Sequence, residues 1–514
     1  ASATPQWAAP CDLAQKYRQG NLVMSLSGKR RAGILLHVTS LPGSGAVGDL
    51  GQEAFHFVRF LHDTGITVWQ TLPLGVTHAD NSPYQSLSAH AGNPELISVD
   101  WLCKQGWLRF ADLPAESKNV YEYPKGALLT KAFHGFLEHG NEGDVLDFDR
   151  FCQDKSFWLD DFALFMALRH EFQEQCWNEW PEHYRDREAK ALQEARRRLK
   201  TRIDCTKFQQ YVFFRQWLEL KAYAAQHSVL LFGDIPIFVS YDSADVWANR
   251  DVFKLDDNGE MLVVAGVPPD YFSATGQRWG NPHFNWHYLR KTNFLWWIDR
   301  LQTQLELFDI LRIDHFRGLE AAWEISASEE TAVNGLWVKA PGKALLSAIN
   351  AAFGDIPLVA EDLGIITPEV EELRDEFHLP GMKILQFAFG GESDNPYLPS
   401  NYNPNCVAYT GTHDNDTTLG WVQKLSNGEI DKIYDYLGNP QLPLHCALIH
   451  AALGSVANLA VIPMQDILEL DSEHRMNTPG TTTGNWTWRF RWDQVTTERA
   501  ERLKHLVRLF NRQA

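Results

Sequence analysis

The chain has 514 residues, of which 44% are hydrophobic and 22% charged, proportions that are ordinary for a globular protein. Its formal net charge of -18 disfavours binding to the phosphate backbone of nucleic acids and to anionic membrane surfaces. The seven cysteines are dispersed without a C-x-x-C pair, Ala1 to Gln19 lack a signal-peptide profile, and no apolar run reaches the roughly 18 residues of a membrane span. We therefore expect a cytoplasmic protein with reduced thiols, or the mature form of one targeted elsewhere.

Strand-like apolar segments alternate with helix-period segments along the chain, a pattern that predicts an α/β fold with a parallel sheet. Eight strands in this order suggest a closed (β/α)8 barrel, or TIM barrel, with helical and loop insertions. The helix-period segments include Glu53–His62, Phe294–Leu307 and Gly342–Ala352. The predicted strands are Gly33–Val38, Val68–Pro73, Val229–Ile235, Phe308–Asp314, Pro357–Glu361, Lys383–Phe389, Val407–Thr412 and Asn458–Pro463.

Two insertions interrupt the predicted barrel, which we place over residues 30–514, after an N-terminal extension of residues 1–29. Between the second and third strands lies an excursion of about 150 residues, too long for a simple connection. Its segments Asp160–Cys176 and Glu188–Gln226 have helical spacing, so we predict a mainly α-helical subdomain over residues 100–226. The second insertion, residues 246–287, contains a hairpin signal at Asn258-Gly259, and we predict that it forms a loop over the cleft.

Acidic residues follow several of the predicted strands, at the end where the active sites of such barrels lie. A single acid after a strand is usually a helix cap or a turn residue. Several acids around one barrel mouth are harder to explain in that way, because like charges held close together require compensation. The acids are Asp234, Asp314, Glu361, Asp362, Asp414 and Asp466.

The spacing of Arg312, Asp314 and Glu361 points to a particular chemistry. Arg312 and Asp314 are two residues apart on one strand, so both side chains point to the same face. An arginine beside a carboxylate keeps it ionised and oriented, as a nucleophile requires. Glu361 ends the next strand, and two carboxyls about 5–5.5 Å apart form a retaining glycosidase-type site. The spacing leaves open which acid has which role.

Several segments resemble the signature blocks of the amylomaltase, or disproportionating enzyme, family of 4-α-glucanotransferases. These segments extend over nearly the whole chain from about Gly33, which makes the resemblance specific. The matching segments are Ser82–Gln85 (SPYQ), Gly233–Val239 (GDIPIFV), Pro268–Asn281 (PPDYFSATGQRWGN), Leu311–Gly318 (LRIDHFRG), Val359–Thr367 (VAEDLGIIT), Tyr409–Trp421 (YTGTHDNDTTLGW) and Met476–Trp488.

The resemblance implies a role for each of three acids. Asp314 is the implied nucleophile, Glu361 the general acid/base, and Asp414 the residue that stabilises the transition state. The resemblance further implies a set of substrate-binding residues, in which Tyr271 and Phe272 lie on a flexible loop over the cleft: Tyr84, Asp234, Tyr271, Phe272, Trp279, Arg312, His413 and Asn477.

Structural roles remain open for some of these residues. His413 could be a hydrogen-bonding histidine at a strand end, and Tyr271, Phe272 and Trp279 could pack within their own loop. The sequence Gly43–Gly48 matches G-x-G-x-x-G, but the second strand ends without an acid for a ribose, so we predict a turn. No metal-ligand spacing accompanies His413, and we expect no metal and no cofactor.

The resemblance implies transfer of α-1,4-glucan segments to the 4-hydroxyl of glucose or another glucan, by disproportionation and possibly cyclisation. An α-1,4-glucan hydrolase with the same catalytic residues is the main alternative, because loop geometry decides whether water replaces the sugar acceptor. An inactive glucan-binding protein is a third, although a binder need not keep a nucleophile and a proton donor. We expect α-1,4-glucans and maltooligosaccharides as the ligands, no nucleic-acid or membrane partner, and a monomer.

Overall fold

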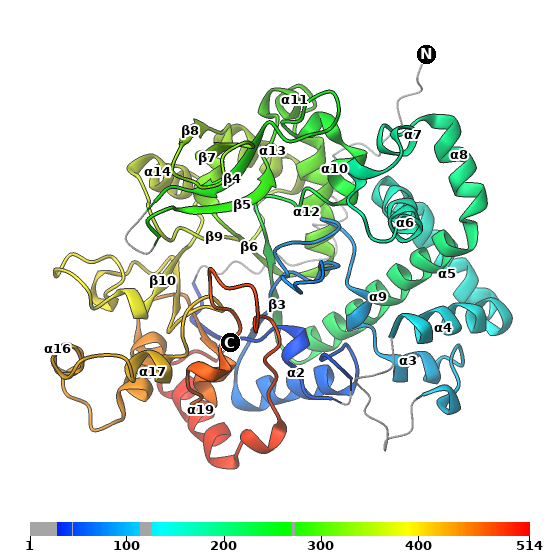
Figure 1. Ribbon diagram of the computed structural model, residues 1–514. Coiled ribbons are helices and arrows are strands. Elements are labelled where there is room, and N and C mark those ends of the chain that lie inside the picture. The colour runs from blue at the N-terminus through cyan, green and yellow to red at the C-terminus, as the bar shows by residue number, and fades with distance from the viewer. Residues whose placement is uncertain (1–27, 44, 114–124, 270–272, 514) are drawn as a thin grey trace.

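A closed barrel of eight parallel strands forms the centre of the computed structural model, which describes residues 28–43, 45–113, 125–269 and 273–513 (Figure 1). Each predicted strand segment overlaps one barrel strand, and the predicted (β/α)8 fold is confirmed. In spatial order the strands are β1 (Arg31–Leu35), β12 (Leu459–Pro463), β11 (Cys406–Tyr409), β10 (Gly381–Ile384), β9 (Leu358–Ala360), β6 (Ile310–Ile313), β3 (Leu230–Ile235) and β2 (Val68–Gln70).

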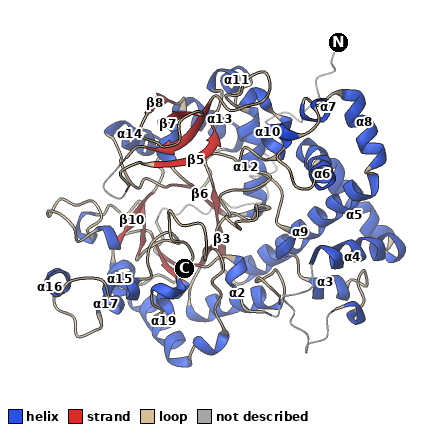
Figure 2. Ribbon diagram, in the orientation of Figure 1, coloured by secondary structure: helices blue, strands red, loops and turns tan. Residues whose placement is uncertain are grey.

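Apolar side chains fill the interior of the barrel, and helices cover its outside (Figure 2). Alternate residues of each strand point inward, where Phe232, Ile310, Val359 and Val407 are fully buried. The helices of the outer layer are α2 (Gln52–Thr64), α9 (Lys200–Gln226), α12 (Leu295–Leu307), α13 (Gly342–Phe353), α14 (Pro368–Glu376), α15 (Thr418–Val422), α16 (Asn427–Tyr436), α17 (Leu444–Gly454), α18 (Met464–Ile467) and α19 (Thr497–Leu509).

Helices occupy the connection between β2 and β3. The 27-residue helix α9 packs against α2 and β3 on one side and against α4, α5, α6 and α8 on the other. The extent of the predicted subdomain, residues 100–226, stays a prediction. The helices of this connection are α3 (Val99–Lys104), α4 (Lys125–His139), α5 (Glu142–Asp154), α6 (Ser156–Glu171), α7 (Glu182–Arg185), α8 (Ala189–Arg198) and α9.

Among the predicted segments, three show the largest differences from the structure. Helix α6 stops at Glu171, because Gln173 and Glu174 adopt positive φ angles of 55° and 63° that end a right-handed helix. The segment 188–226 is divided at Leu199 into α8 and α9. The strand predicted over 383–389 ends at Ile384, where a 3-10 turn carries the chain out of the barrel.

A four-stranded antiparallel sheet, which the sequence did not reveal, lies beside the barrel mouth (Figure 2). Its order is β5 (Gln277–Pro282), β4 (Val263–Val267), β7 (Ala321–Ser326) and β8 (Gly335–Lys339). Strands β4 and β5 come from the predicted 246–287 insertion, and β7 and β8 from the connection that follows β6. Helix α10 (Ala244–Ala248) overlaps the start of the insertion, and α11 (Trp286–Lys291) follows β5. The Asn258-Gly259 turn closes a short hairpin with an antiparallel bridge between Leu255 and Met261. None of the helices in the described ranges is long and apolar enough to span a bilayer.

Candidate active site

Strand register brings Asp234 and Arg312 together at the mouth of the barrel. They are paired on the neighbouring strands β3 and β6, so their side chains point to the same side. Arg312 donates from Nε to Asp234 at 2.9 Å, and its Nη2 lies 2.8 Å from the other carboxylate oxygen. Tyr84 donates its hydroxyl hydrogen to Asp234 at 2.7 Å and accepts one from Arg312 at 3.1 Å. Both members of the ion pair are buried, so the contact holds the guanidinium of Arg312 in a fixed position.

Asp314 and Glu361 are the first residues after β6 and β9, two neighbouring parallel strands. The ladder continues through them, because the backbone N–H of Glu361 donates to Ile313 at 3.0 Å and that of Asp314 donates to Ile235 at 2.9 Å. Arg312 Nη2 donates to Oδ1 of Asp314 at 2.7 Å. Both carboxyl groups line one cleft, as the spacing of the sequence predicted.

The surroundings of Glu361 and Asp314 shift the pKa values of the two carboxyls in ways that suit different chemical roles. Burial, and then the charge of Asp314, raises the pKa of Glu361 well above its usual range. Burial also raises the pKa of Asp314, but the adjacent Arg312 guanidinium opposes that shift. Because only Asp314 receives a direct arginine hydrogen bond, Asp314 loses its proton first as the pH rises. The pair can therefore hold one ionised and one protonated carboxyl at neutral pH.

The third acid, Asp414, is held ionised beyond the end of β11. Its place in the cleft raises its pKa, but His413 and Asn477 outweigh this effect and lower the pKa of Asp414 well below its usual range. His413 Nε2 lies 3.3 Å from Oδ2, and Asn477 donates from Nδ2 to Oδ1 at 2.6 Å. About half of the Asp414 side chain, 49%, remains exposed, so it can accept hydrogen bonds from a bound molecule.

Two residues near Asp414, Arg475 and Trp486, were not among the predicted site residues. Arg475 donates from Nη2 to the backbone carbonyl of Asp414 at 2.9 Å and from Nε to that of Asn477 at 3.1 Å. The Trp486 ring lies 6.0 Å from the rings of Tyr84 and His413, which stack on each other at 5.2 Å. Trp486 belongs to the Met476–Trp488 segment, so the resemblance itself pointed to it. Arg475 lies one residue before that segment.

The cleft has a volume of about 960 Å³, within the range of sites that bind organic ligands. The ring of Trp279 on β5 borders it and packs edge-on against His315, with 4.8 Å between the ring centres. Asp234 and His413 lie beside the cleft: Asp234 is hydrogen-bonded to Tyr84 and Arg312, and His413 lies 3.3 Å from Asp414. Tyr271 and Phe272 lie outside the described residues. Predicted site residues that line the cleft are Tyr84, Trp279, Arg312, Asp314, Glu361, Asp414 and Asn477.

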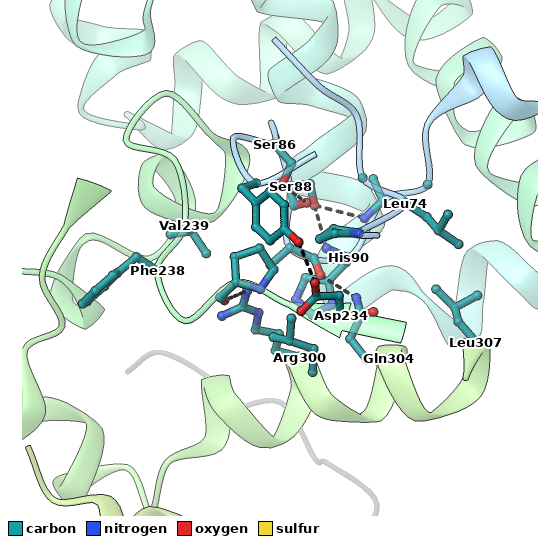
Figure 3. A pocket seen from close by; sticks show the side chains of 18 residues that line it. Leu74, Ser86, Ser88, His90, Asp234, Phe238, Val239, Arg300, Gln304 and Leu307 are labelled. Atoms are coloured by element: carbon teal, nitrogen blue, oxygen red, sulfur yellow. Dashed lines mark hydrogen bonds between the residues drawn. The ribbon is translucent and has the colours of Figure 1, made fainter. Parts of the chain in front are cut away.

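A much smaller cavity, of about 30 Å³, lies behind Asp234 (Figure 3). It has room for about one water molecule and cannot hold a sugar. Arg300 borders it and donates to the backbone carbonyls of Pro236 and Ile237, and His90 makes a 2.9 Å hydrogen bond with Thr303. These buried contacts fix the chain just after Asp234, so this region supports the site from behind.

Two of the acids at the strand ends have structural contacts instead. Asp362 accepts hydrogen bonds from Arg374 at 2.6 Å and from the backbone of Met382 at 2.7 Å. Asp466 accepts hydrogen bonds from the hydroxyls of Thr410 and Thr418, both at 2.6 Å. Asp362 and Asp466 therefore have the structural role that is usual for a single acid after a strand. The sequence did not distinguish these two acids from the acids of the cleft.

Among the described residues, one group of side chains is close enough to hold a metal ion: His445, Cys446 and Glu469. The group lies on the outer helix layer, and none of its members lines the cleft. Arg502 forms an ion pair with Glu469 and approaches the sulfur of Cys446 at 3.9 Å. Its positive charge opposes a second cation there, so these residues do not fit a resident metal well.

Comparison with known proteins agrees with this geometry. Residues 36–496 match the family described as 4-alpha-glucanotransferase. The chain is 49% identical to the 4-alpha-glucanotransferase of Synechocystis sp., with 94% of this chain and 98% of that protein covered. It is also 49% identical to the enzyme of the same name from Thermus thermophilus, with 93% and 98% covered.

A solved structure extends the comparison to three dimensions. The amylomaltase from Streptococcus agalactiae, in complex with acarbose, superposes with a TM-score of 0.90 at 38% identity, covering 95% of this chain and 100% of that one. The match includes the barrel and its insertions, since nearly the whole of each chain is aligned. The chain belongs to the 4-alpha-glucanotransferase family.

Proposed function

We propose that the protein transfers α-1,4-glucan segments from a donor to the 4-hydroxyl of glucose or of another glucan, through a covalent glucosyl ester on Asp314. The observation that carries the proposal is the placement of Asp314 and Glu361 at the ends of neighbouring strands in one cleft. Burial and the charge of Asp314 raise the pKa of Glu361, which keeps that carboxyl protonated for the first step.

In the first step, Glu361 donates its proton to the glycosidic oxygen while a carboxylate oxygen of Asp314 attacks the anomeric carbon. The bond between that carbon and the glycosidic oxygen breaks, and the reducing-end fragment leaves with the proton. Arg312 binds Oδ1 of Asp314, which leaves Oδ2 as the attacking atom. The products are a glucosyl ester and an ionised Glu361.

In the second step, the ionised Glu361 removes the proton from the 4-hydroxyl of the acceptor. The acceptor oxygen attacks the anomeric carbon, and the ester bond to Asp314 breaks. Two inversions retain the α configuration, and both carboxyls return to their first protonation states. Glu361 thus takes from the acceptor a proton that replaces the one lost with the reducing-end fragment.

The other residues of the site bind and orient the sugar. Asp414, held ionised by His413 and Asn477, is placed to accept hydrogen bonds from sugar hydroxyls and to stabilise positive charge that develops at the anomeric carbon. Beside Asp414, hydrogen bonds hold the side chains of Arg312, Asp234 and Tyr84 in fixed positions. For Tyr271, Phe272 and Trp279 we keep the sugar-contacting roles that the family resemblance implies.

Incubation with purified maltotriose tests the proposal. Transfer produces glucose together with a ladder of longer maltooligosaccharides, because the glycosyl group held on Asp314 is passed to another sugar. Products that are only shorter than the donor indicate an α-1,4-glucan hydrolase, and maltotriose binding without any product indicates a binding protein. Either of the last two results would contradict the proposal.

Further proposals concern the protein as a whole. We retain from the sequence a monomer in the cytoplasm that works without a cofactor or a metal and has no nucleic-acid or membrane partner. The net charge of -18 and an uncharged glucan substrate support this assignment of partners. The helices between β2 and β3, over residues 100–226, are proposed as a subdomain, and residues 246–287 as a cover of the cleft.

A further inference from the structure

Trp337, on strand β8, borders the cleft and was not among the predicted site residues. It lines the cleft together with Arg317 and Ile365. The tryptophan is 38% exposed and the isoleucine 52% exposed, so both present apolar surface to the cleft. Exposed apolar residues grouped at the edge of a cleft are typical of a binding surface.

The Trp337 ring is held in place before any ligand arrives. The guanidinium carbon of Arg317 lies 3.7 Å from the ring centre, a cation–π contact. Arg317 is itself buried, and its Nη1 donates to the backbone carbonyl of Ile365. On the adjacent strand β7, Trp323 packs against Trp337 with the ring planes at 63° and the centres 5.2 Å apart. A ring fixed on two sides loses little freedom when a ligand binds to it.

Trp337, Arg317 and Ile365 form one wall of the cleft. The contacts of this wall connect it to the side of the cleft that contains Glu361. Arg317 follows Phe316, whose backbone N–H donates to the carbonyl of Glu361 at 3.1 Å. Ile365 is four residues beyond Glu361 on the same loop. Asp414 belongs to a different loop, after β11, and is tied to Asn477 and Arg475.

The proton donor of a retaining site faces the bond to the leaving fragment, and the acceptor later enters the same space. The wall around Trp337 therefore borders the leaving-group and acceptor side of the proposed reaction. Aromatic side chains offer a flat apolar face with a large contact area, which suits the apolar face of a sugar ring. A water molecule gains nothing from such a surface, so the surface favours a sugar over water at this position.

We propose that Trp337, supported by Arg317, forms an acceptor-side subsite for an α-1,4-linked glucosyl unit and thereby favours transfer over hydrolysis. This inference rests on the proposed function and assigns a residue to the choice between the two acceptors. The same surface borders the leaving fragment in the first half of the reaction, and the choice between sugar and water is made in the second half, after the ester on Asp314 has formed.

The test compares Trp337→Ala, Trp337→Leu and the wild type. With a fixed donor and maltose as the varied acceptor, we expect the KM for maltose to rise about tenfold in Trp337→Ala, the effect of losing one good contact. The fraction of donor lost to water should rise as well. Trp337→Leu keeps apolar packing on Arg317 but removes the flat ring, so it should show the same direction of change even if Trp337→Ala folds poorly.

Two controls make the result specific. Leu336→Ala alters the neighbouring residue of β8, which is 72% exposed and does not line the cleft, and it should behave as the wild type. Fluoride release from α-maltotriosyl fluoride provides a reference rate for each variant, since fluoride needs no sugar subsite to leave.

The KM for maltose and the hydrolysed fraction are compared between variants, with fluoride release as the reference rate for each. If both quantities were unchanged in both variants while the wild type transfers normally, Trp337 would have no acceptor role. A wild type that makes no longer oligosaccharides would instead contradict the proposed function itself. The two failures are thus distinguishable.

Discussion

One carboxyl oxygen of Glu361, Oε2, accepts a 2.6 Å hydrogen bond from the backbone N–H of His315, the residue that directly follows Asp314. His315 has a φ angle of 52°, a left-handed conformation that few side-chain-bearing residues adopt, and the turn directs this N–H toward the neighbouring strand. A backbone donor cannot rotate away as a side chain can. The proposed acid/base is therefore positioned by the turn that begins at the proposed nucleophile.

Asp314→Asn is expected to lower kcat with maltotriose by at least about 10⁴-fold, the effect of removing a catalytic group that acts only in the reacting complex. Maltotriose binding, measured by calorimetry, should change much less, because the amide keeps the size of the side chain and a hydrogen bond with Arg312 is still possible. Asp431→Asn, at an exposed position of α16, is the matched control and should keep full activity. Activity within tenfold of the wild type would exclude Asp314 as the nucleophile.

Glu361→Gln is expected to separate the two halves of the reaction. Turnover of maltotriose should fall by about 10²–10⁴-fold, since general acid–base catalysis contributes that much. Fluoride release from α-maltotriosyl fluoride should fall far less, because fluoride leaves without a proton. Added azide, which needs no base, should then form a maltotriosyl azide of α configuration. Equal losses with both donors and no azide product would show that Glu361 is not the proton donor.

The pH dependence of kcat/KM is expected to be bell-shaped, with both limbs at unusually high pH for two carboxyls. Activity requires ionised Asp314, so it is lost as the pH falls through the pKa of that group, which burial raises. Activity also requires protonated Glu361, so it is lost as the pH rises through the pKa of Glu361, which burial and Asp314 raise well above the ordinary value of 4.5. The basic limb should disappear in Glu361→Gln with the fluoride donor. An optimum below pH 4.5 would contradict both shifts.

Most of the fold followed from the sequence because the barrel strands are short, buried and strongly apolar. The inward-pointing residues must fill the barrel interior, so each strand shows its own run of apolar residues, such as Val68, Phe232 and Val407. A strand of this kind can be recognised from a short stretch of sequence alone. The antiparallel sheet gave no such signal. Strand β5 contains Gln277, Arg278 and Gly280, and β8 is mostly exposed, so neither shows alternating apolar residues. Strands β5 and β8 pair with β4 and β7, and the sheet is completed by the pairing of β4 with β7, which joins parts of the chain more than 40 residues apart.

The site was predictable where chemistry and position coincide, as for Asp314 and Glu361 at two strand ends. It was not predictable where a residue acts through its backbone contacts or its packing. Arg475 binds two carbonyl oxygens, which leave no trace in the sequence, and Trp337 reaches the cleft only because β8 lies next to β7. The buried Asp466 resembled a site acid until its threonine partners were located.

Arg475→Lys tests whether the geometry of Asp414 depends on the arginine that binds its backbone. A lysine keeps the charge but cannot donate to two carbonyl oxygens in the fixed arrangement of a guanidinium. We expect kcat to fall about tenfold or more with little change in KM, because Asp414 acts mainly in the transition state. Arg491→Lys is the control, since the Arg491 side chain is 72% exposed and pairs with the exposed Asp493. A rise in KM without a loss of kcat would place Arg475 in substrate binding instead.

Two glycines of helix α4 give opposite predictions for stability. In general, glycine to alanine within a helix stabilises by up to about 1 kcal/mol. A Cβ at Gly126 would meet no atom of the described residues within 4 Å, so Gly126→Ala should raise the melting temperature slightly. A Cβ at Gly135 would lie 2.0 Å from the backbone carbonyl oxygen of Trp107, which cannot move aside as a side chain can. Gly135→Ala should therefore destabilise by about 1–3 kcal/mol through overpacking. Urea titration of both variants measures the difference, and a Gly135→Ala variant as stable as Gly126→Ala would show that α4 does not pack this closely on Trp107.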